Sequence, residues 1–220
     1  MKNLQENIQI IDKELLEMLY KVDRALVLTQ EMISKNEYDI KIYGETKLIE
    51  EETDAIQVSL DEKVITAIAR FQPAAGELRY LTRIPAITTD LERITDILIG
   101  VLKSIRKYYE TNKEPDKNIT FLPQITEKVT HIFRLFKQAF IEKKLDNIYL
   151  LLGLDDEVDK IRTACIQTAI DKMMEDKGNI MAGVTNIIIA QKYERIADII
   201  ENLAESLIYI SKGEDIRHKN

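Results

Sequence analysis

The chain has 220 residues, of which 45% are hydrophobic and 31% charged, and its formal net charge is −7. The acidic balance argues against nonspecific nucleic-acid binding, which needs a basic face. No apolar run reaches the roughly 20 residues of a membrane span, and the N-terminus lacks the apolar region of a signal peptide. The single cysteine, Cys165, excludes an intrachain disulfide and fits a reducing compartment. We therefore expect a cytoplasmic protein.

Apolar residues recur at three- and four-residue steps along almost the whole chain, which predicts an all-α protein. The first half should contain a helix that ends before a break at 34–37, followed by helices over about 38–71 and 77–109. A Pro- and Gly-containing turn at 72–76 separates the last two. Pro85 lies inside the third of these helices and predicts a kink or a local break there.

The stretch 111–118 contains no apolar residue except a proline and is the most linker-like part of the sequence. After it the pattern predicts a helix through 129–140, a helix over about 147–176 and a helix over about 180–211. Three helices, a linker and three more helices with short connections indicate antiparallel neighbours in a helical bundle.

A short acidic motif occurs twice on the predicted helices. Residues 92–96 read ERITD and residues 194–198 read ERIAD, at an offset of 194 − 92 = 102 residues. Each preceding helix carries another acidic pair at the same i, i+4 spacing, in EEETD at 50–54 and DDEVD at 155–159. The offset is close to half the chain, so the pattern indicates a duplicated helical unit that presents paired carboxylates.

Helix geometry places both acids of such a pair on one face, because residues i and i+4 differ by only about 40° around the axis. On a helical wheel Glu92 and Asp96 fall opposite the apolar stripe, so they point outward and not into the core. Oxygen ligands without His or Cys suit hard cations such as magnesium, calcium, manganese or iron. From the spacing alone, a solvated acidic face is favoured over a metal site.

No glycine-rich phosphate loop, zinc-finger spacing or nucleophile elbow is present in the sequence. His131 is interpreted as a helix-surface residue, His218 as part of a polar tail and Cys165 as a core residue. Any catalysis would therefore have to be metal-based. Two hypotheses besides regulation stay open: a carboxylate-bridged metal enzyme or storage protein, and a structural helical adaptor.

Residues 70–79, RFQPAAGELR, followed by TTDLERITD at 88–96, resemble the signature of the PhoU family of phosphate-signalling regulators. The second half is similar to the family at LDDEVD, 154–159, and at YERIADIIENLAE, 193–205. The resemblance spans nearly the whole chain. It implies two tandem three-helix bundles related by pseudo-twofold symmetry, with domains of residues 1–112 and 113–220.

The resemblance also implies a non-enzymatic regulator that keeps phosphate-starvation genes off when phosphate is plentiful. The implied partners are the ATPase subunit of the phosphate ABC transporter, a sensor histidine kinase and a second copy of the chain. Nucleic acid is not among them, and membrane association would occur only through these partners.

Surface metal sites of iron, manganese, magnesium or zinc are a further implication of the resemblance. The residues that match the family motif are Glu50, Asp54, Glu92, Asp96, Asp155, Asp159, Glu194 and Asp198. Gly100 stands where the second half has Asn202, and family members commonly have a polar residue there. We therefore expect the first site to bind metal more weakly than the second.

Overall fold

The computed structural model describes residues 3–111 and 122–212, and for Asp155 only the backbone. Every regular element in these ranges is helical, which confirms the all-α prediction. The elements are α1 (Leu4–Lys35), α2 (Ile40–Phe71), α3 (Ala75–Thr111), α4 (Leu122–Glu142), α5 (Asp146–Leu152), α6 (Asp155–Glu175), the short 3₁₀ helix η1 (Lys177–Asn179) and α7 (Ile180–Lys212). None of the helices in these ranges is long and apolar enough to cross a membrane.

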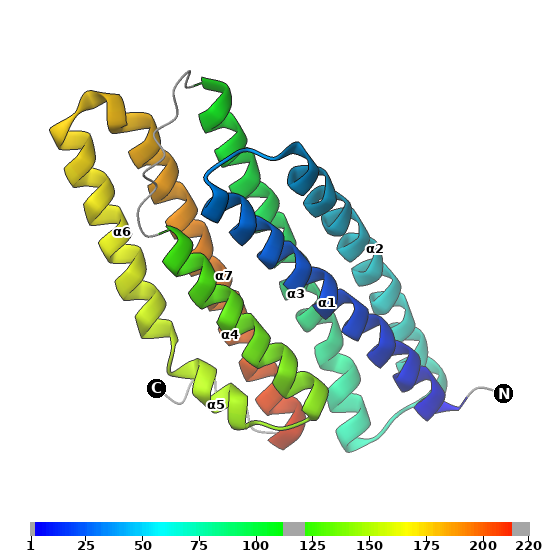
Figure 1. The fold of residues 1–220 in the computed structure, drawn as a ribbon. Helices are drawn as coiled ribbons and strands as arrows, with labels where there is room; N and C mark the ends of the chain where they lie inside the picture. Colours follow the sequence, from blue (N-terminus) through cyan, green and yellow to red (C-terminus); the bar gives the residue numbers. More distant parts are fainter. Residues whose placement is uncertain (1–2, 112–121, 213–220) are drawn as a thin grey trace.

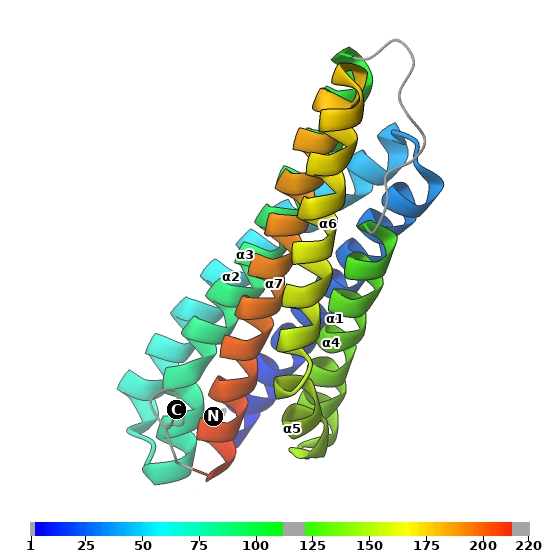
Figure 2. The same cartoon turned by 90° about the vertical axis from the view of Figure 1, so that its left-hand side faces the viewer.

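The helices form two three-helix bundles that lie side by side. Helices α1, α2 and α3 make the first bundle, and α4, α6 and α7 make the second, with α3 and α7 antiparallel at the centre (Figure 1). Helices α2 and α6 lie at the two outer edges, and the turned view places α1 and α4 together in one layer (Figure 2). The predicted boundary between residues 112 and 113 lies outside the described residues and stays a prediction.

Helix ends in the first half follow local chemistry. The Asn3 side chain accepts a hydrogen bond from the Glu6 backbone N–H at 2.9 Å and so caps α1. Asn36, with φ of 51°, is the C-cap of α1, and Gln72, with φ of 47°, is the C-cap of α2. Left-handed residues of this kind commonly terminate helices. Both ends coincide with the breaks predicted at 34–37 and 72–76.

The helix predicted over 147–176 is wrong as a single element, because it is interrupted between α5 and α6. Gly153 follows the last residue of α5, and glycine is a poor helix former. Asp156 and Glu157 then lie in the first turn of α6, where the helix dipole favours negative charge. The chain therefore turns between a residue that disfavours helix and a first turn that the helix dipole stabilises.

Helix α3 continues through Pro85, which excludes a local break there, and the alternative of a kink stays a prediction. A proline removes one intrahelical hydrogen bond, but tertiary packing supplies most of the stability of a helix in a protein. Leu81, Ile84 and Ile87 are buried on either side of Pro85. This packing holds the helix together across the missing bond.

One hydrophobic core runs through both bundles. Ion pairs between α1 and α4 add to this connection, because Asp23 accepts from Arg134 at 3.1 Å and also from Lys137. The Lys137 ammonium lies 4.8 Å from the centre of the Tyr20 ring. The two bundles are therefore joined by polar as well as apolar contacts.

We predict that Asp23→Ala lowers the free energy of unfolding by about 1–3 kcal/mol, because it leaves the largely buried Lys137 without its carboxylate. Urea denaturation of the full chain measures the change. The control is Glu110→Ala, which breaks the exposed pair with Arg106 and should cost no more than about 0.5 kcal/mol. Equal losses in the two variants would show that the α1–α4 ion pairs do not stabilise the assembly.

Candidate metal centre

A pair of buried threonines sets α2 against α3. The hydroxyl oxygens of Thr53 and Thr95 lie 2.9 Å apart, and both side chains are fully buried. Each hydroxyl also lies within hydrogen-bonding distance of the carbonyl three residues earlier in its own helix, at 2.9 Å and 2.7 Å. This contact fixes the register of the two helices.

The predicted acids stand at matching offsets from these threonines, three residues before and one residue after each. The first acidic cluster is Glu50, Asp54, Glu92 and Asp96. Burial raises the pKa of Glu92, and the negative charges of Asp96, Asp54 and Glu50 raise it further. The pKa of Asp96 is also raised, first by burial and then by Glu50. The four carboxylates are therefore close enough to repel one another.

A lysine of α2 already forms ion pairs at one edge of the first acidic cluster. Lys47 pairs with Glu50 and lies 3.6 Å from Glu51, each about one helical turn further along α2. Lys47 also lowers the pKa of Asp96, with a smaller effect than Lys103 has. Lys47 thus offsets part of the negative charge from the side of α2.

The corresponding acids of the second bundle are arranged differently. Arg162 lies between them, with one guanidinium nitrogen 3.1 Å from Asp159 on α6 and the other 3.8 Å from Glu194 on α7. The pKa of Asp198 is raised by burial and by Asp159, and Arg162 opposes this shift. The side chain of Asp155 lies outside the described residues. The Arg162 side chain therefore bridges two of the four acids that were predicted to bind a metal.

The acids lie at the outer surface, as the helical wheel predicted. Asp54, Asp96, Asp159 and Asp198 are exposed, and the glutamates of the motifs are half-buried. Among the described residues, no three His, Cys, Asp or Glu side chains are already arranged to hold one metal ion. The first acidic cluster fits a hard cation in donor type and proximity, but its side chains would have to turn toward the ion. Metal binding stays a prediction.

Other predicted residues have simpler roles. Cys165 is buried, as expected, and burial raises the pKa of its thiol to about 11. His131 is exposed on α4, which agrees with its interpretation as a surface residue, and His218 lies outside the described residues.

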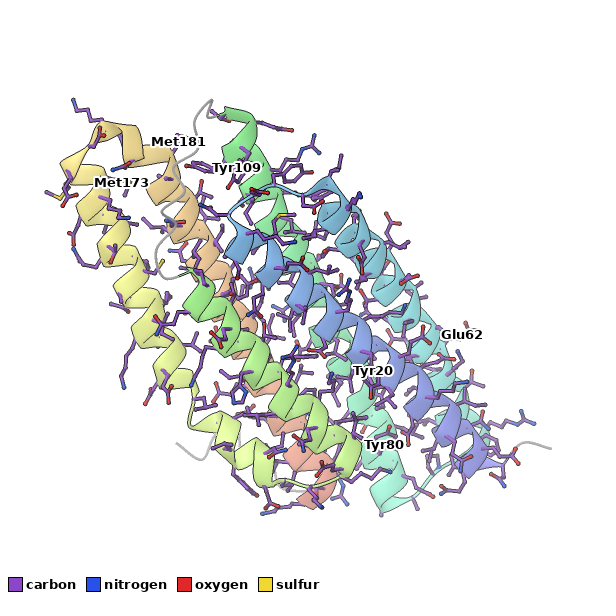
Figure 3. All side chains as sticks on the ribbon, viewed as in Figure 1. Tyr20, Glu62, Tyr80, Tyr109, Met173 and Met181 are labelled. Carbon is purple, nitrogen blue, oxygen red and sulfur yellow. The ribbon has the colours of Figure 1, made fainter. Side chains whose placement is uncertain are left out.

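A cavity of about 480 Å³ lies between α1, α3, α4 and α7, and no sequence pattern predicted it. At its wall the Tyr80 hydroxyl donates to Asp12, and Figure 3 shows Tyr80 near the N-terminal end of α3. The lining is mostly apolar and comes from four separate helices. A cavity assembled in this way leaves no local sequence pattern.

Comparisons with known proteins agree with this geometry. The PhoU domain model matches residues 15–105 and 122–207, in both bundles. The chain belongs to the PhoU family. A PhoU homolog of Aquifex aeolicus (strain VF5), named as a phosphate-specific transport system accessory protein, is 30% identical over 94% of this chain and 96% of its own length. The accessory protein PhoU of Serratia marcescens is 27% identical over 79% of this chain and 71% of its own length.

Solved PhoU structures share the fold. The crystal structure of PhoU from Pseudomonas aeruginosa has a TM-score of 0.89 at 23% identity and covers 96% of this chain and 100% of that one. The regulatory protein PhoU from Streptococcus pneumoniae has a TM-score of 0.83 at 19% identity, with coverage of 97% and 99%. The tandem arrangement of bundles predicted from the PhoU resemblance is therefore confirmed.

The repulsion within the first acidic cluster leads to a pH-dependent prediction. Because the folded pKa of Glu92 and of Asp96 is raised, their contribution to stability is present at low pH and is lost as pH rises through the folded pKa. In metal-free protein, Glu92→Gln/Asp96→Asn should therefore raise stability at pH 7 by about 0.2–0.5 kcal/mol for each repulsive pair removed. The gain should vanish below about pH 4, where carboxylates are neutral.

Thermal unfolding between pH 3 and pH 8, with chelator present, measures this difference. The control is Glu127→Gln on α4, an exposed acid for which the stability difference should stay near zero at every pH. A double variant that is less stable than the parent at pH 7 would contradict mutual repulsion.

Proposed function

We propose that this chain is a non-enzymatic accessory regulator of phosphate uptake and phosphate-starvation signalling. The observation that carries the proposal is the match of the PhoU domain to both bundles, over 15–105 and 122–207. Relatives that align along most of the chain are named as accessory proteins of the phosphate-specific transport system. A pair of helical bundles with large outer faces suits a protein that acts by contact with others.

The proposed partners are the ATPase subunit of the phosphate ABC transporter, a sensor histidine kinase and a second copy of the chain. The protein would act in the cytoplasm and reach the membrane only through these partners. Exposed apolar side chains near the α6–α7 turn supply contact area, since grouped exposed apolar residues are typical of interaction sites. They include Met174, Met181, Val184 and Ile188, and Figure 3 labels Met181 at this end of the molecule.

Deletion of the gene should raise transcription of phosphate-starvation genes in phosphate-rich medium, because the regulator that holds them off is gone. Transcript levels measure the effect, and expression of the wild-type chain from a plasmid should restore repression. Transcript levels that do not respond to deletion would refute the regulatory role. A strain that instead loses only cellular metal content would point to a storage protein.

The proposal includes a hard cation at the first acidic cluster. Four carboxylates from two helices lie near one another there, and a bound cation would remove the repulsion that, after burial, raises the pKa of Glu92. In the second bundle Arg162 already supplies positive charge between Asp159 and Glu194. These contacts favour stronger binding in the first bundle, the reverse of the order that Gly100 suggested from the sequence.

Titration of chelator-treated protein with manganese tests this part by calorimetry and by the shift in unfolding temperature. Manganese at 100 times its Kd should stabilise the wild-type chain by about 2.7 kcal/mol. Glu92→Gln/Asp96→Asn should remove most of this shift, whereas Arg162→Gln should add a second binding event by freeing the acids of the second bundle. Equal binding by all three proteins would exclude both clusters as metal sites.

A further inference from the structure

A lysine of α7 lies directly over a bare backbone position of α3. The Lys192 ammonium stands 2.5 Å from the point that a β-carbon on residue 100 would occupy, and its ε-carbon stands 3.6 Å from that point. Only glycine leaves room for such an approach. Gly100, which departs from the family pattern, thus forms a seat for a cation at the contact between the two bundles.

The position of this lysine follows from the packing of α3 on α7. Elsewhere along the same pair of helices, the Arg83 guanidinium lies 4.1 Å from the centre of the Tyr209 ring. Both contacts fit one antiparallel register, in which Gly100 stands opposite Lys192 and Arg83 stands opposite Tyr209. The lysine is therefore held by the core interface and not by a mobile surface loop.

Two further cations surround this seat. Lys103 lies one turn beyond Gly100 on α3, and Arg195 lies one turn beyond Lys192 on α7. Burial lowers the pKa of Lys192, and the positive charges of Arg195 and Lys103 lower it further. Within residues 3–111 and 122–212, none of the three side chains makes a salt bridge or a hydrogen bond. Lys103 also lowers the pKa of Asp96.

The equivalent place in the duplicated unit has acids at two of the three cation positions, and only Arg93, which corresponds to Arg195, keeps the positive charge. At the offset of 102 residues, Asp90 corresponds to Lys192, Asn202 to Gly100 and Glu205 to Lys103. Asp90 there forms an ion pair with Arg93 at 3.4 Å. Lys192 and Lys103 are therefore specific to this place, whereas Arg195 belongs to the repeated motif. Bringing like charges together at a half-buried position costs free energy that an anion would offset.

We propose that Gly100, Lys103, Lys192 and Arg195 form a binding site for a small multivalent oxyanion of the phosphate class. The Lys192 ammonium would lie at its floor, where the missing side chain of Gly100 leaves space. Lysine binds phosphate as a point charge, and the arginine fork can make two parallel hydrogen bonds to an oxyanion. The oxyanion is either free inorganic phosphate or a phosphoryl group on a partner protein.

The site rests on the three cations and their geometry, whereas the choice of phosphate as the first probe rests on the proposed function. Calorimetry on the full chain, treated with chelator and held at constant ionic strength with chloride, measures binding of inorganic phosphate and of a phosphoserine peptide. The probe that binds more tightly identifies the source of the oxyanion. Absence of binding by both probes would overturn the proposal.

Lys192→Gln should weaken binding about tenfold or more, because it removes a charge-assisted contact. The matched control is Lys13→Gln on α1, an exposed lysine whose loss changes the net charge equally. If the two variants bind alike, the anion is held by net charge only. Lys192 would then pack its aliphatic part over Gly100 with its ammonium in solvent, and it would not contact the anion.

A pair of glycine variants separates binding from folding. Gly100→Ala places a methyl group against the flexible end of Lys192, which can move away, so the chain should fold and lose most of its anion affinity. Gly44→Ala on α2 meets nothing within 4 Å and should leave affinity unchanged. Both variants should unfold at a higher temperature, because alanine favours helix over glycine. Equal affinity in the two variants would overturn the assignment of Gly100.

Failure of this site is distinguishable from failure of the proposed function. A wild-type chain that restores repression in the deletion strain but binds neither probe would leave the regulator in place and remove only the oxyanion site.

Discussion

The antiparallel packing of α3 on α7 is the contact on which the rest of the structure depends. It joins two bundles into one core, because buried side chains of both central helices belong to the same apolar cluster. It also leaves another flank of each helix free to pair with α2 or α6, where the acidic motifs stand. The α3–α7 contact even sets the place of Lys192, since its ammonium has room only where α3 presents Gly100.

The two acidic sites have the same helical backbone and motif spacing, but the side chains that surround the acids differ. In the first bundle a polar contact between Thr53 and Thr95 joins the helices beneath the acids, whereas Val158 and Ala197 are buried at the matching positions of the second. The acids of the second bundle are bridged by Arg162, while those of the first have a cation only at one edge. Two sites with nearly the same motif therefore differ in how much negative charge remains for a ligand.

Much of this arrangement could be predicted from the sequence, because the signals are local. Helical periodicity predicts the long helices, and the outward direction of Glu92 and Asp96 follows from the angle between them and the apolar stripe. The interruption before α6 was missed, and the continuity of α3 through Pro85 was not foreseen, because both depend on a balance between weak local preferences and packing that only the fold supplies. Arg162, Lys192 and Gly100 were missed as partners for another reason. Their contacts join different helices, and no spacing rule marks them.

The acidic and cationic groups share one outward face of α3, and this proximity connects their electrostatics. Around the helix, Glu92, Asp96, Gly100 and Lys103 fall within about 80° of one another. The two groups already sense each other, since Lys103 lowers the pKa of Asp96 against the upward shift from burial and Glu50. A cation bound among the acids would cancel charge that now attracts Lys103, and an anion at Lys192 would act in the opposite sense on the same residues. By thermodynamic reciprocity, each ligand would then strengthen the binding of the other by the same factor. Such coupling requires no movement of the bundles, because charge alone carries it across one or two turns of a single helix.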